Sequence, residues 1–258
     1  MALIKISNIS KKYTIDRYAI QDVSFSVEGG EIVGLIGPNG AGKSTTLSIL
    51  TGLIYPSAGS VVICDSDLGQ HPKLAKSALG YAPDNTDLVQ DLTLFEYVQL
   101  SISLYNAYRA PTIEYACHLI DFFGMSAYKH HLLRTYSHGM LKKAQIIACL
   151  AHKPKVVIFD EPTSGLDIES QVLFKMLCRR LSDANVAILI ATHQMALANE
   201  LCDKICMLKL GRVIAWDNTK NLLQTHAVQT LEDVFIKLAF DTQKTAADLE
   251  KINHHLSL

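Results

Sequence analysis

"GPNGAGKS", Gly37 to Ser44, decides the fold, because it fits the pattern G-x-x-x-x-G-K-[ST] at every fixed position. The apolar run Ile32 to Ile36 before it has the length of a strand, and "TLSILTGL" after it has helical spacing. In such a strand–loop–helix unit the glycines let backbone N–H groups point at phosphate oxygens, and the helix start adds its positive end. The stretch therefore predicts a nucleoside triphosphate site, with Lys43 against the β and γ phosphates and Ser44 on Mg²⁺.

A second set of candidate residues follows the buried strand predicted by "KVVIFDEP", residues 155–162. Asp160 and Glu161 end that strand, at the sheet edge where ligands sit in open α/β folds. Asp160 would hold Mg²⁺ through water and Glu161 would polarise the attacking water, since phosphoryl chemistry depends on positioning and charge. His193 follows the next apolar strand, in "ATHQM", and is either a phosphate contact or a structural histidine.

The order of the predicted elements indicates an α/β protein. Apolar strands alternate with helical segments, which favours a mostly parallel sheet flanked by helices. Residues 85–150 are rich in helix-period segments such as "LFEYVQLSISLY", so we expect an inserted helical lobe there, between core segments 1–84 and 151–215. We place a single domain over 1–240 and a polar tail over 241–258.

The composition fits a globular protein of the cytosol. Hydrophobic residues make up 49% and charged residues 19% of the 258, so the chain can bury a sizeable core. A formal net charge of −1 gives no electrostatic reason to expect a nucleic-acid partner, and no apolar run is long enough to cross a bilayer.

Cys202 and Cys206 could share a helix face and bind a metal, but no histidine spacing completes a zinc site, so we expect buried, reduced thiols.

The motifs and their order point to a family. After the phosphate loop come "YSHGM" (136–140), "DEP" with "SGLD" (160–167) and His193, and with this set the chain resembles the nucleotide-binding subunit of an ATP-binding cassette (ABC) transporter. The resemblance implies a P-loop NTPase (RecA-like) fold with an N-terminal antiparallel β subdomain, and it implies ATP and Mg²⁺ as ligands. The ATP would be held by Gly37, Pro38, Asn39, Gly40, Ala41, Gly42, Lys43, Ser44 and Thr45. Tyr13, in "KKY", would stack on adenine, unless it is only a strand tyrosine.

"YSHGM" resembles the family signature, usually written LSGGQ. The resemblance implies that two subunits dimerise head to tail and bury two ATP molecules, each between one phosphate loop and the other subunit's signature. Ser137 and Gly139 would then supply a hydroxyl and a close backbone approach to the γ-phosphate at a helix N-terminus, and Asp167 would also contact nucleotide. His138 replaces the first signature glycine; its ring either points away to the helical lobe or adds a titratable donor near the phosphate.

Asp84, in "GYAPDN", stands where the family usually has a glutamine that reaches Mg²⁺ and the attacking water. Our hypothesis is that Asp84 keeps the metal role but slows hydrolysis until both protomers close; the alternative is an ordinary loop residue. The groove between this loop and the helical lobe is where a membrane subunit's helix would dock. Leu88, Leu92 and Phe95 are candidates for its apolar lining, or for core packing.

We therefore predict an ATPase subunit that drives a separately encoded membrane permease from the cytoplasmic face of the cell membrane, with export favoured by the resemblance. A homodimer is the first expectation and a heterodimer the alternative. The competing function is a soluble cassette ATPase acting on ribosomes or DNA, but such relatives usually carry two cassettes or a long coiled-coil insertion. A regulatory module without turnover would be indicated by loss of Glu161 or His193, and both are present.

Overall fold

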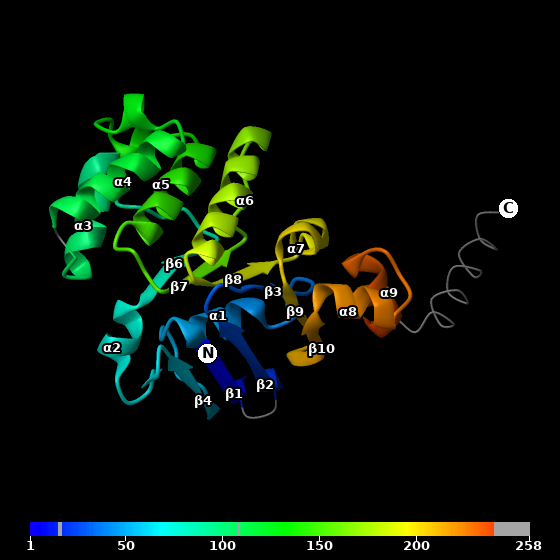
Figure 1. Cartoon of the computed structure of the whole chain (residues 1–258). Helices are drawn as coiled ribbons and strands as arrows, with labels where there is room; N and C mark the ends of the chain where they lie inside the picture. Colours follow the sequence, from blue (N-terminus) through cyan, green and yellow to red (C-terminus); the bar gives the residue numbers. More distant parts are fainter. Residues whose placement is uncertain (15–16, 108, 240–258) are drawn as a thin grey trace, which may run out of the picture.

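The computed structural model describes residues 1–14, 17–107 and 109–239. The protein is built around two β-sheets (Figure 1). The larger sheet has six strands in the order β10-β9-β3-β8-β7-β6. These strands are β3 (Ile32–Ile36), β6 (Leu79–Ala82), β7 (Val156–Asp160), β8 (Ala187–Thr192), β9 (Lys204–Lys209) and β10 (Arg212–Asn218). All neighbours pair in parallel except β9 and β10, which form a hairpin, so the predicted mostly parallel sheet is confirmed.

The second sheet is antiparallel and is built mainly from the N-terminal segment. Its four strands run in the order β2-β1-β4-β5. They are β1 (Ala2–Thr14), β2 (Arg17–Glu28), β4 (Ala58–Ile63) and β5 (Ser66–Asp67). Helix α1 (Lys43–Leu50) shares one buried core with both sheets, through residues such as Ile4 of β1, Leu47 of α1 and Leu35 of β3. The predicted N-terminal antiparallel subdomain is confirmed, and it supports the helix that begins at Lys43.

Three helices form a group that stands to one side of the large sheet (Figure 1). They are α3 (Leu94–Leu104), α4 (Ala110–Phe122) and α5 (His138–Leu150), with 3₁₀ turns at Ser126–Tyr128 and Leu133–Thr135 between α4 and α5. Their facing side chains, among them Val98, Ala116 and Ile147, are almost fully buried. Helix α5 packs against α3 and α4 and also against β6, so it joins this group to the sheet. The proposed division at residues 85 and 150 stays a prediction.

The remaining helices flank the sheet or follow it. They are α2 (Pro72–Ser77), α6 (Ile168–Asp183), α7 (Met195–Leu201), α8 (Thr219–Thr225) and α9 (Leu231–Ala239). Helix α9 packs on α7 and α8. Within the described ranges, no helix combines the length and apolar character that crossing a membrane requires. The polar tail expected over 241–258 lies outside the described residues.

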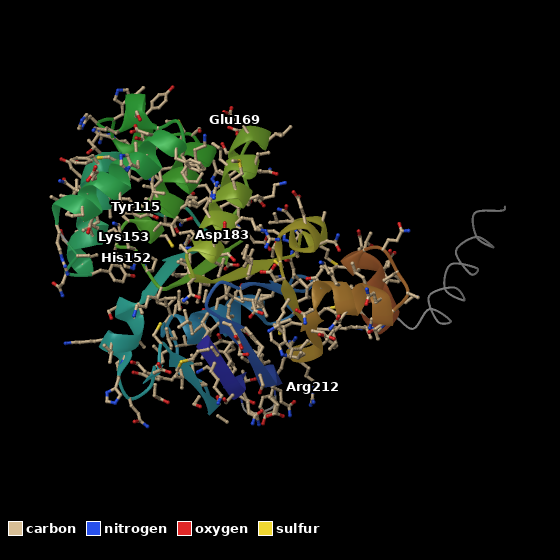
Figure 2. The ribbon with its side chains drawn as sticks, viewed as in Figure 1. Tyr115, His152, Lys153, Glu169, Asp183 and Arg212 are labelled. Carbon is tan, nitrogen blue, oxygen red and sulfur yellow. The ribbon has the colours of Figure 1, made fainter. Side chains whose placement is uncertain are left out.

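Side-chain contacts hold the segment after α5 against α4. Figure 2 shows Tyr115 of α4 close to Lys153, whose Nζ lies 5.0 Å from the centre of the tyrosine ring. The neighbouring His152 stacks on Tyr105, at the end of α3, with ring centres 3.6 Å apart. The turn that leads into β7 is therefore held by both helices.

The idea that Cys202 and Cys206 share a helix face is wrong. Cys202 caps the C-terminus of α7, whereas Cys206 lies inside β9, because the chain changes from helix to strand between them. Both are buried free thiols, and burial raises the pKa of each, that of Cys202 to about 12. Protonated, buried thiols are poor metal ligands.

Candidate functional site

The loop between β3 and α1 borders an open cleft of about 510 Å³. The ends of β1 and β2 form the opposite wall. The cleft is lined by Tyr13, Thr14, Arg17, Tyr18, Ala19, Pro38, Asn39, Gly40, Gly42, Lys43, Ser44, Thr45 and Leu210. Tyr13 is 63% exposed, so its ring is available to a ligand. Gly37 and Ala41 lie behind this lining, and Ala41 is buried in the core shared by the two sheets.

The backbone at Gly42 explains why the loop needs glycine there. Its φ is +108°, a conformation that L side chains rarely adopt. A Cβ at this position would also lie 2.5 Å from Cγ2 of Ile20 and 3.1 Å from the carbonyl oxygen of Ala19. Gly42 is the N-cap of α1 and no side chain caps that helix, so its first N–H groups remain available to an anion.

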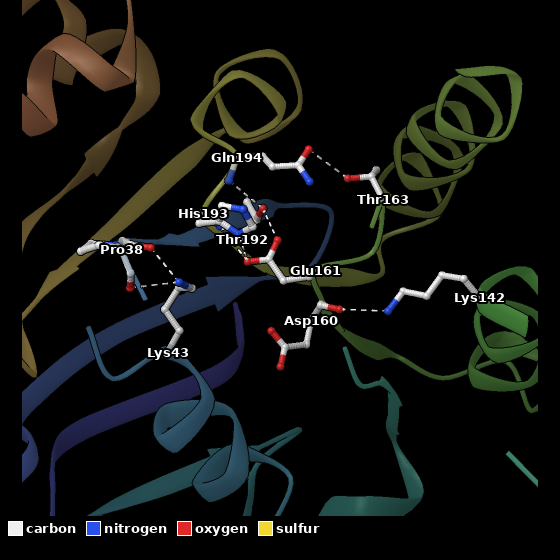
Figure 3. Close-up of polar contacts among 10 residues, drawn as sticks. Pro38, Lys43, Lys142, Asp160, Glu161, Thr163, Thr192, His193 and Gln194 are labelled. Atoms are coloured by element: carbon white, nitrogen blue, oxygen red, sulfur yellow. Dashed lines mark hydrogen bonds and ion pairs between the residues drawn. The ribbon is translucent and has the colours of Figure 1, made fainter. Parts of the chain in front are cut away.

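Lys43 lies over the loop that it is expected to serve. Its Nζ donates to the carbonyl oxygens of Gly37 (2.6 Å) and Pro38 (3.3 Å; Figure 3). Burial lowers the pKa of Lys43, and the nearby carboxylates of Glu161 and Asp160 oppose that shift. The ammonium group is thus held at the loop, where phosphate oxygens can replace the carbonyl acceptors.

Glu161 and His193 meet at the ends of β7 and β8. Nδ1 of His193 lies 2.6 Å from Oε1 of Glu161, and the His193 backbone N–H donates to the same oxygen at 2.9 Å. Oε2 of Glu161 accepts from the Thr192 hydroxyl at 2.8 Å (Figure 3). Glu161 is 9% exposed and has a positive φ of 43°. Its carboxylate is therefore fixed in direction before any ligand binds.

Asp160 and Asp84 come together because β6 and β7 pair in parallel register, with Ala82 opposite Phe159. Burial, together with the charges of Asp84 and Glu161, raises the pKa of Asp160 to about 6. Asp84 itself is exposed. Negative charge is therefore concentrated at the ends of β6 and β7, and a bound cation would reduce the repulsion between these carboxylates.

The "YSHGM" segment begins α5 and touches the "SGLD" loop. Ser137 is the N-cap, and its hydroxyl accepts from the Met140 N–H at 3.3 Å. A Cβ on Gly139 would lie 2.8 Å from the carbonyl oxygen of Gly165, so only glycine permits this approach. The ring of His138 covers Gly165, and its Nδ1 lies 3.4 Å from Oγ1 of Thr86. The ring therefore faces loops of its own chain.

Comparison with known proteins identifies the family. A family model described as ABC transporter matches residues 20–164, more than half of the chain. The chain belongs to the ABC transporter family. It is an ATP-binding and ATP-hydrolysing subunit of such a transporter, as its resemblance predicted.

Two curated ABC relatives illustrate the similarity. The Nod factor export ATP-binding protein I of Burkholderia orbicola is 34% identical over 222 residues, covering 83% of this chain and 70% of the relative. The ABC transporter ATP-binding protein NatA of Bacillus subtilis is 33% identical over 219 residues, covering 84% of this chain and 89% of NatA.

Solved structures agree with the fold. An ATP-binding subunit of an ABC transporter has a TM-score of 0.88 at 29% identity, covering 92% of this chain and all of that one. A bacterial ABC transporter cassette solved as a dimer has a TM-score of 0.76 at 25% identity, covering 84% of this chain and 98% of that one. The P-loop NTPase fold is confirmed.

The residues expected to contact ATP in this ABC subunit fall into two separate groups. Tyr13 and most of the phosphate loop line the cleft, but Ser137, Gly139 and Asp167 are absent from its lining. Asp167 instead caps α6, where its side chain accepts from the Ser170 N–H at 2.7 Å, and hydrogen bonding from the Ser170 side chain and backbone lowers the pKa of Asp167. A single chain therefore does not bring its signature to its own phosphate loop.

The donor set fits Mg²⁺ held chiefly through nucleotide. Among the described residues, no cluster of three or more His, Cys, Asp or Glu side chains could hold a metal ion alone. Mg²⁺ in ATPases is usually held by one or two protein oxygens together with phosphates and water. Ser44 at the start of α1 and Asp160 at the end of β7 provide such oxygens, and Asp84 adds a third candidate. Burial and the charges of Asp84 and Glu161 raise the pKa of Asp160, and a bound cation would favour its ionised form.

Sequence reasoning missed Lys142. This lysine of α5 is fully buried, and its Nζ donates to the carbonyl oxygens of Pro83 (2.9 Å), Asp84 (3.2 Å) and Asp160 (3.3 Å). In the sequence it stands in "LKK", which reads as an ordinary polar turn of a helix. No local pattern could reveal carbonyl groups that come from segments 18 to 59 residues away.

Proposed function

We propose that this subunit acts in pairs, and that two cassettes bury two ATP molecules head to tail while they drive a separate membrane permease. The observation that carries the proposal is the separation of Ser137 and Gly139 from the cleft at Lys43. Both groups have the chemistry of a phosphate site: an anion-ready helix start at α1 and a glycine-bearing helix start at α5. A second copy can bring its α5 to the open cleft, and the dimeric ABC cassette with the same fold supports this arrangement.

In the proposed reaction, the phosphate loop and Lys43 hold the β and γ phosphates of ATP. Mg²⁺, held by Ser44, Asp160 and Asp84, would neutralise negative charge on the phosphates. Glu161 orients and polarises the water that attacks the γ-phosphate, because its carboxylate is fixed by Thr192 and His193. His193 lies beside Glu161 with its side chain 55% exposed, so it can also reach a phosphate oxygen.

The binding surface proposed for the permease lies beside the Asp84 loop. Leu88 lines a small pocket there together with Tyr97 and Tyr105 of the α3 segment. Phe95 is half-buried, and its ring packs edge-on against His130. Leu92 is also half-buried. Leu88 and Phe95 pack partly against the core of their own chain, and their partial exposure leaves apolar surface that a helix could contact.

We further propose export as the direction of transport and the cytoplasmic face of the membrane as the location. The supporting observation is that relatives over more than four fifths of the chain are named for Nod factor export and for lipopolysaccharide export. The homodimer remains the first expectation, because one chain supplies both the cleft and the α5 surface.

Purification tests this function directly. The chain, with an affinity tag, is co-expressed with a membrane protein of about six apolar spans encoded beside it. We expect the two to co-purify from detergent-solubilised membranes in a complex that contains two cassettes, and ATP hydrolysis to rise when the complex is placed in lipid. Sedimentation with ribosomes or binding to DNA, in the absence of a membrane partner, would favour the soluble alternative and overturn the proposal.

A further inference from the structure

Lys142 lies in the second turn of α5, five residues after the N-cap Ser137, and its side chain is fully buried. An ammonium group has three N–H donors. Lys142 directs them at three carbonyl oxygens, those of Pro83, Asp84 and Asp160 (Figure 3 shows the bond to Asp160). None of the ion pairs found in the described ranges includes this lysine. Its hydrogen bonds therefore all go to backbone, and the charges of Asp84, Asp160 and Glu161 also attract its ammonium group.

The three carbonyl groups belong to the two segments that carry the candidate Mg²⁺ ligands. Pro83 and Asp84 follow β6, and Asp160 ends β7. The carboxylates of Asp84 and Asp160 repel each other, which contributes to the raised pKa of Asp160. A cation placed between their main chains keeps the segments together despite that repulsion.

Two other side chains of α5 contact the same loop, whereas Lys143 of α5 pairs with Asp167. Gln145 donates to the carbonyl oxygen of Asn85 at 2.6 Å, and His138 lies beside Thr86. Lys142 differs because its bonds extend across to β7. Within the described part of the chain, it is the side chain of α5 that joins the loop to the strand end carrying Asp160.

Helix α5 connects Lys142 to the signature segment "YSHGM" at its N-terminus. Ser137 and Gly139 begin the same helix, about 7.5 Å and about 4.5 Å from Lys142 along its axis at about 1.5 Å per residue. A helix transmits displacement along its axis, so movement of its N-terminus moves Lys142. In the proposed dimer, this N-terminus contacts the ATP held by the partner's phosphate loop.

We propose that Lys142 is a positioning residue that couples the two nucleotide sites of the dimer: contact of the signature with the partner's ATP sets the position of Asp84 and Asp160 in the chain's own site. This inference rests on the proposed head-to-tail dimer. It accounts for a fully buried lysine whose donors are all used on main-chain oxygens beside the metal site.

The test is Lys142→Met, with Lys175→Met as the matched control. Lys175 is a partly buried lysine of α6 that pairs with Glu200. ATP hydrolysis is measured against ATP concentration, and ATP binding is measured by calorimetry in EDTA, at a protein concentration at which light scattering shows a monomer. Two interacting sites allow a Hill coefficient of about 2 in the wild type. We expect Lys142→Met to bring this value close to 1 while ATP affinity in EDTA changes less than about twofold, since the phosphate loop is untouched.

A second measurement keeps the proposal independent of turnover. In a Glu161→Gln background, we expect Lys142→Met to weaken ATP-dependent dimerisation, measured by light scattering, while Lys175→Met leaves it unchanged. If Lys142→Met does not fold, Lys142→Gln replaces it, because an amide keeps two of the three donors and should give an intermediate Hill coefficient.

Three outcomes would overturn the inference. A folded Lys142→Met protein with wild-type cooperativity and dimerisation would show that Lys142 does not couple the sites. A parallel fall in ATP affinity in EDTA and in the unfolding temperature would show a purely structural role. A wild-type protein that hydrolyses ATP without cooperativity and never dimerises would instead remove the proposed dimer, and the inference with it.

Discussion

Glu161 and His193 form a contact across two neighbouring parallel strands, with Oε1 of the glutamate 2.6 Å from Nδ1 of the histidine. The backbone N–H of His193 and the hydroxyl of Thr192 hold the same carboxylate from the β8 side. Three donors thus fix a side chain that follows β7. A carboxylate held in this way needs no rearrangement to orient a water molecule, and such preorganisation is a main source of catalytic rate.

Glu161→Gln should abolish turnover and preserve ATP binding. The amide can still accept a bond from Thr192 or His193 but cannot polarise water as a base, a loss worth about 10²- to 10⁴-fold in rate. ATP that is bound and not hydrolysed should accumulate a dimer, visible by gel filtration with phosphate release measured in parallel. Glu200→Gln on α7 is the control, since Glu200 pairs with Lys175. Turnover near the wild-type rate would contradict the role of Glu161.

Asp84→Gln should raise the basal rate of ATP hydrolysis and alter its Mg²⁺ dependence. The change removes a negative charge that raises the pKa of Asp160, so Asp160 should ionise at a lower pH and bind metal more readily in acid. Asp91→Asn is the control, because Asp91 is an exposed acid that pairs with Arg134. Rates are measured by phosphate release over a Mg²⁺ titration. An unchanged basal rate and Mg²⁺ dependence would contradict the hypothesis.

The local motifs predicted the mostly parallel sheet and the strand end that carries Asp160 and Glu161, whereas the antiparallel N-terminal sheet was implied by the family resemblance. Those predictions succeed because a strand–loop–helix unit and an apolar strand each leave a pattern within a few residues. Lys142 left no such pattern, since its acceptors come from distant segments. The prediction that Cys202 and Cys206 share a helix face is wrong because a local spacing misled it. A spacing of four fits a helix, but the chain leaves α7 at Cys202 and then enters strand β9.

His138→Gly should leave the pH profile of ATP hydrolysis unchanged between pH 6 and 8. The ring lies beside Thr86 and over Gly165, which are loops of its own chain, and not in the phosphate cleft. A loss of that contact costs at most about tenfold in rate, the value of one weak hydrogen bond. His118→Ala, on the exposed side of α4, is the control. A limb near the usual histidine pKa, present in wild type and absent in His138→Gly, would place the ring beside the phosphate instead.

Asp160→Asn should stabilise the metal-free, nucleotide-free protein at neutral pH although it removes a metal ligand. The folded pKa of Asp160 is about 6, above its usual value, so the ionised form is disfavoured in the folded state. The unfolded chain therefore loses its proton first, and stability falls as pH rises through about 4 to 6. Thermal unfolding in EDTA should show Asp160→Asn melting above wild type at pH 7.5 and approaching it at pH 4.5. A melting temperature of Asp160→Asn below that of wild type at pH 7.5 would contradict the raised pKa of Asp160 in the folded protein.

His152→Phe should make the protein lose less stability as the pH falls. This pH dependence is opposite to that of Asp160, which costs stability as the pH rises. Burial lowers the pKa of His152 to about 4, and its ring stacks on Tyr105 with an interplanar angle of 6°. The unfolded chain takes up a proton near the ordinary histidine pKa of about 6.5, while the folded protein does not, so stability is lost as pH falls from about 6.5 to 4. Phenylalanine keeps the stacked ring and cannot titrate. Between pH 7 and 5, the melting temperature of His152→Phe should therefore fall less than that of wild type, by the order of 2–4 °C, which corresponds to about 1 kcal/mol for a chain of this size. Equal slopes in the two proteins would show that His152 is not held neutral in the fold.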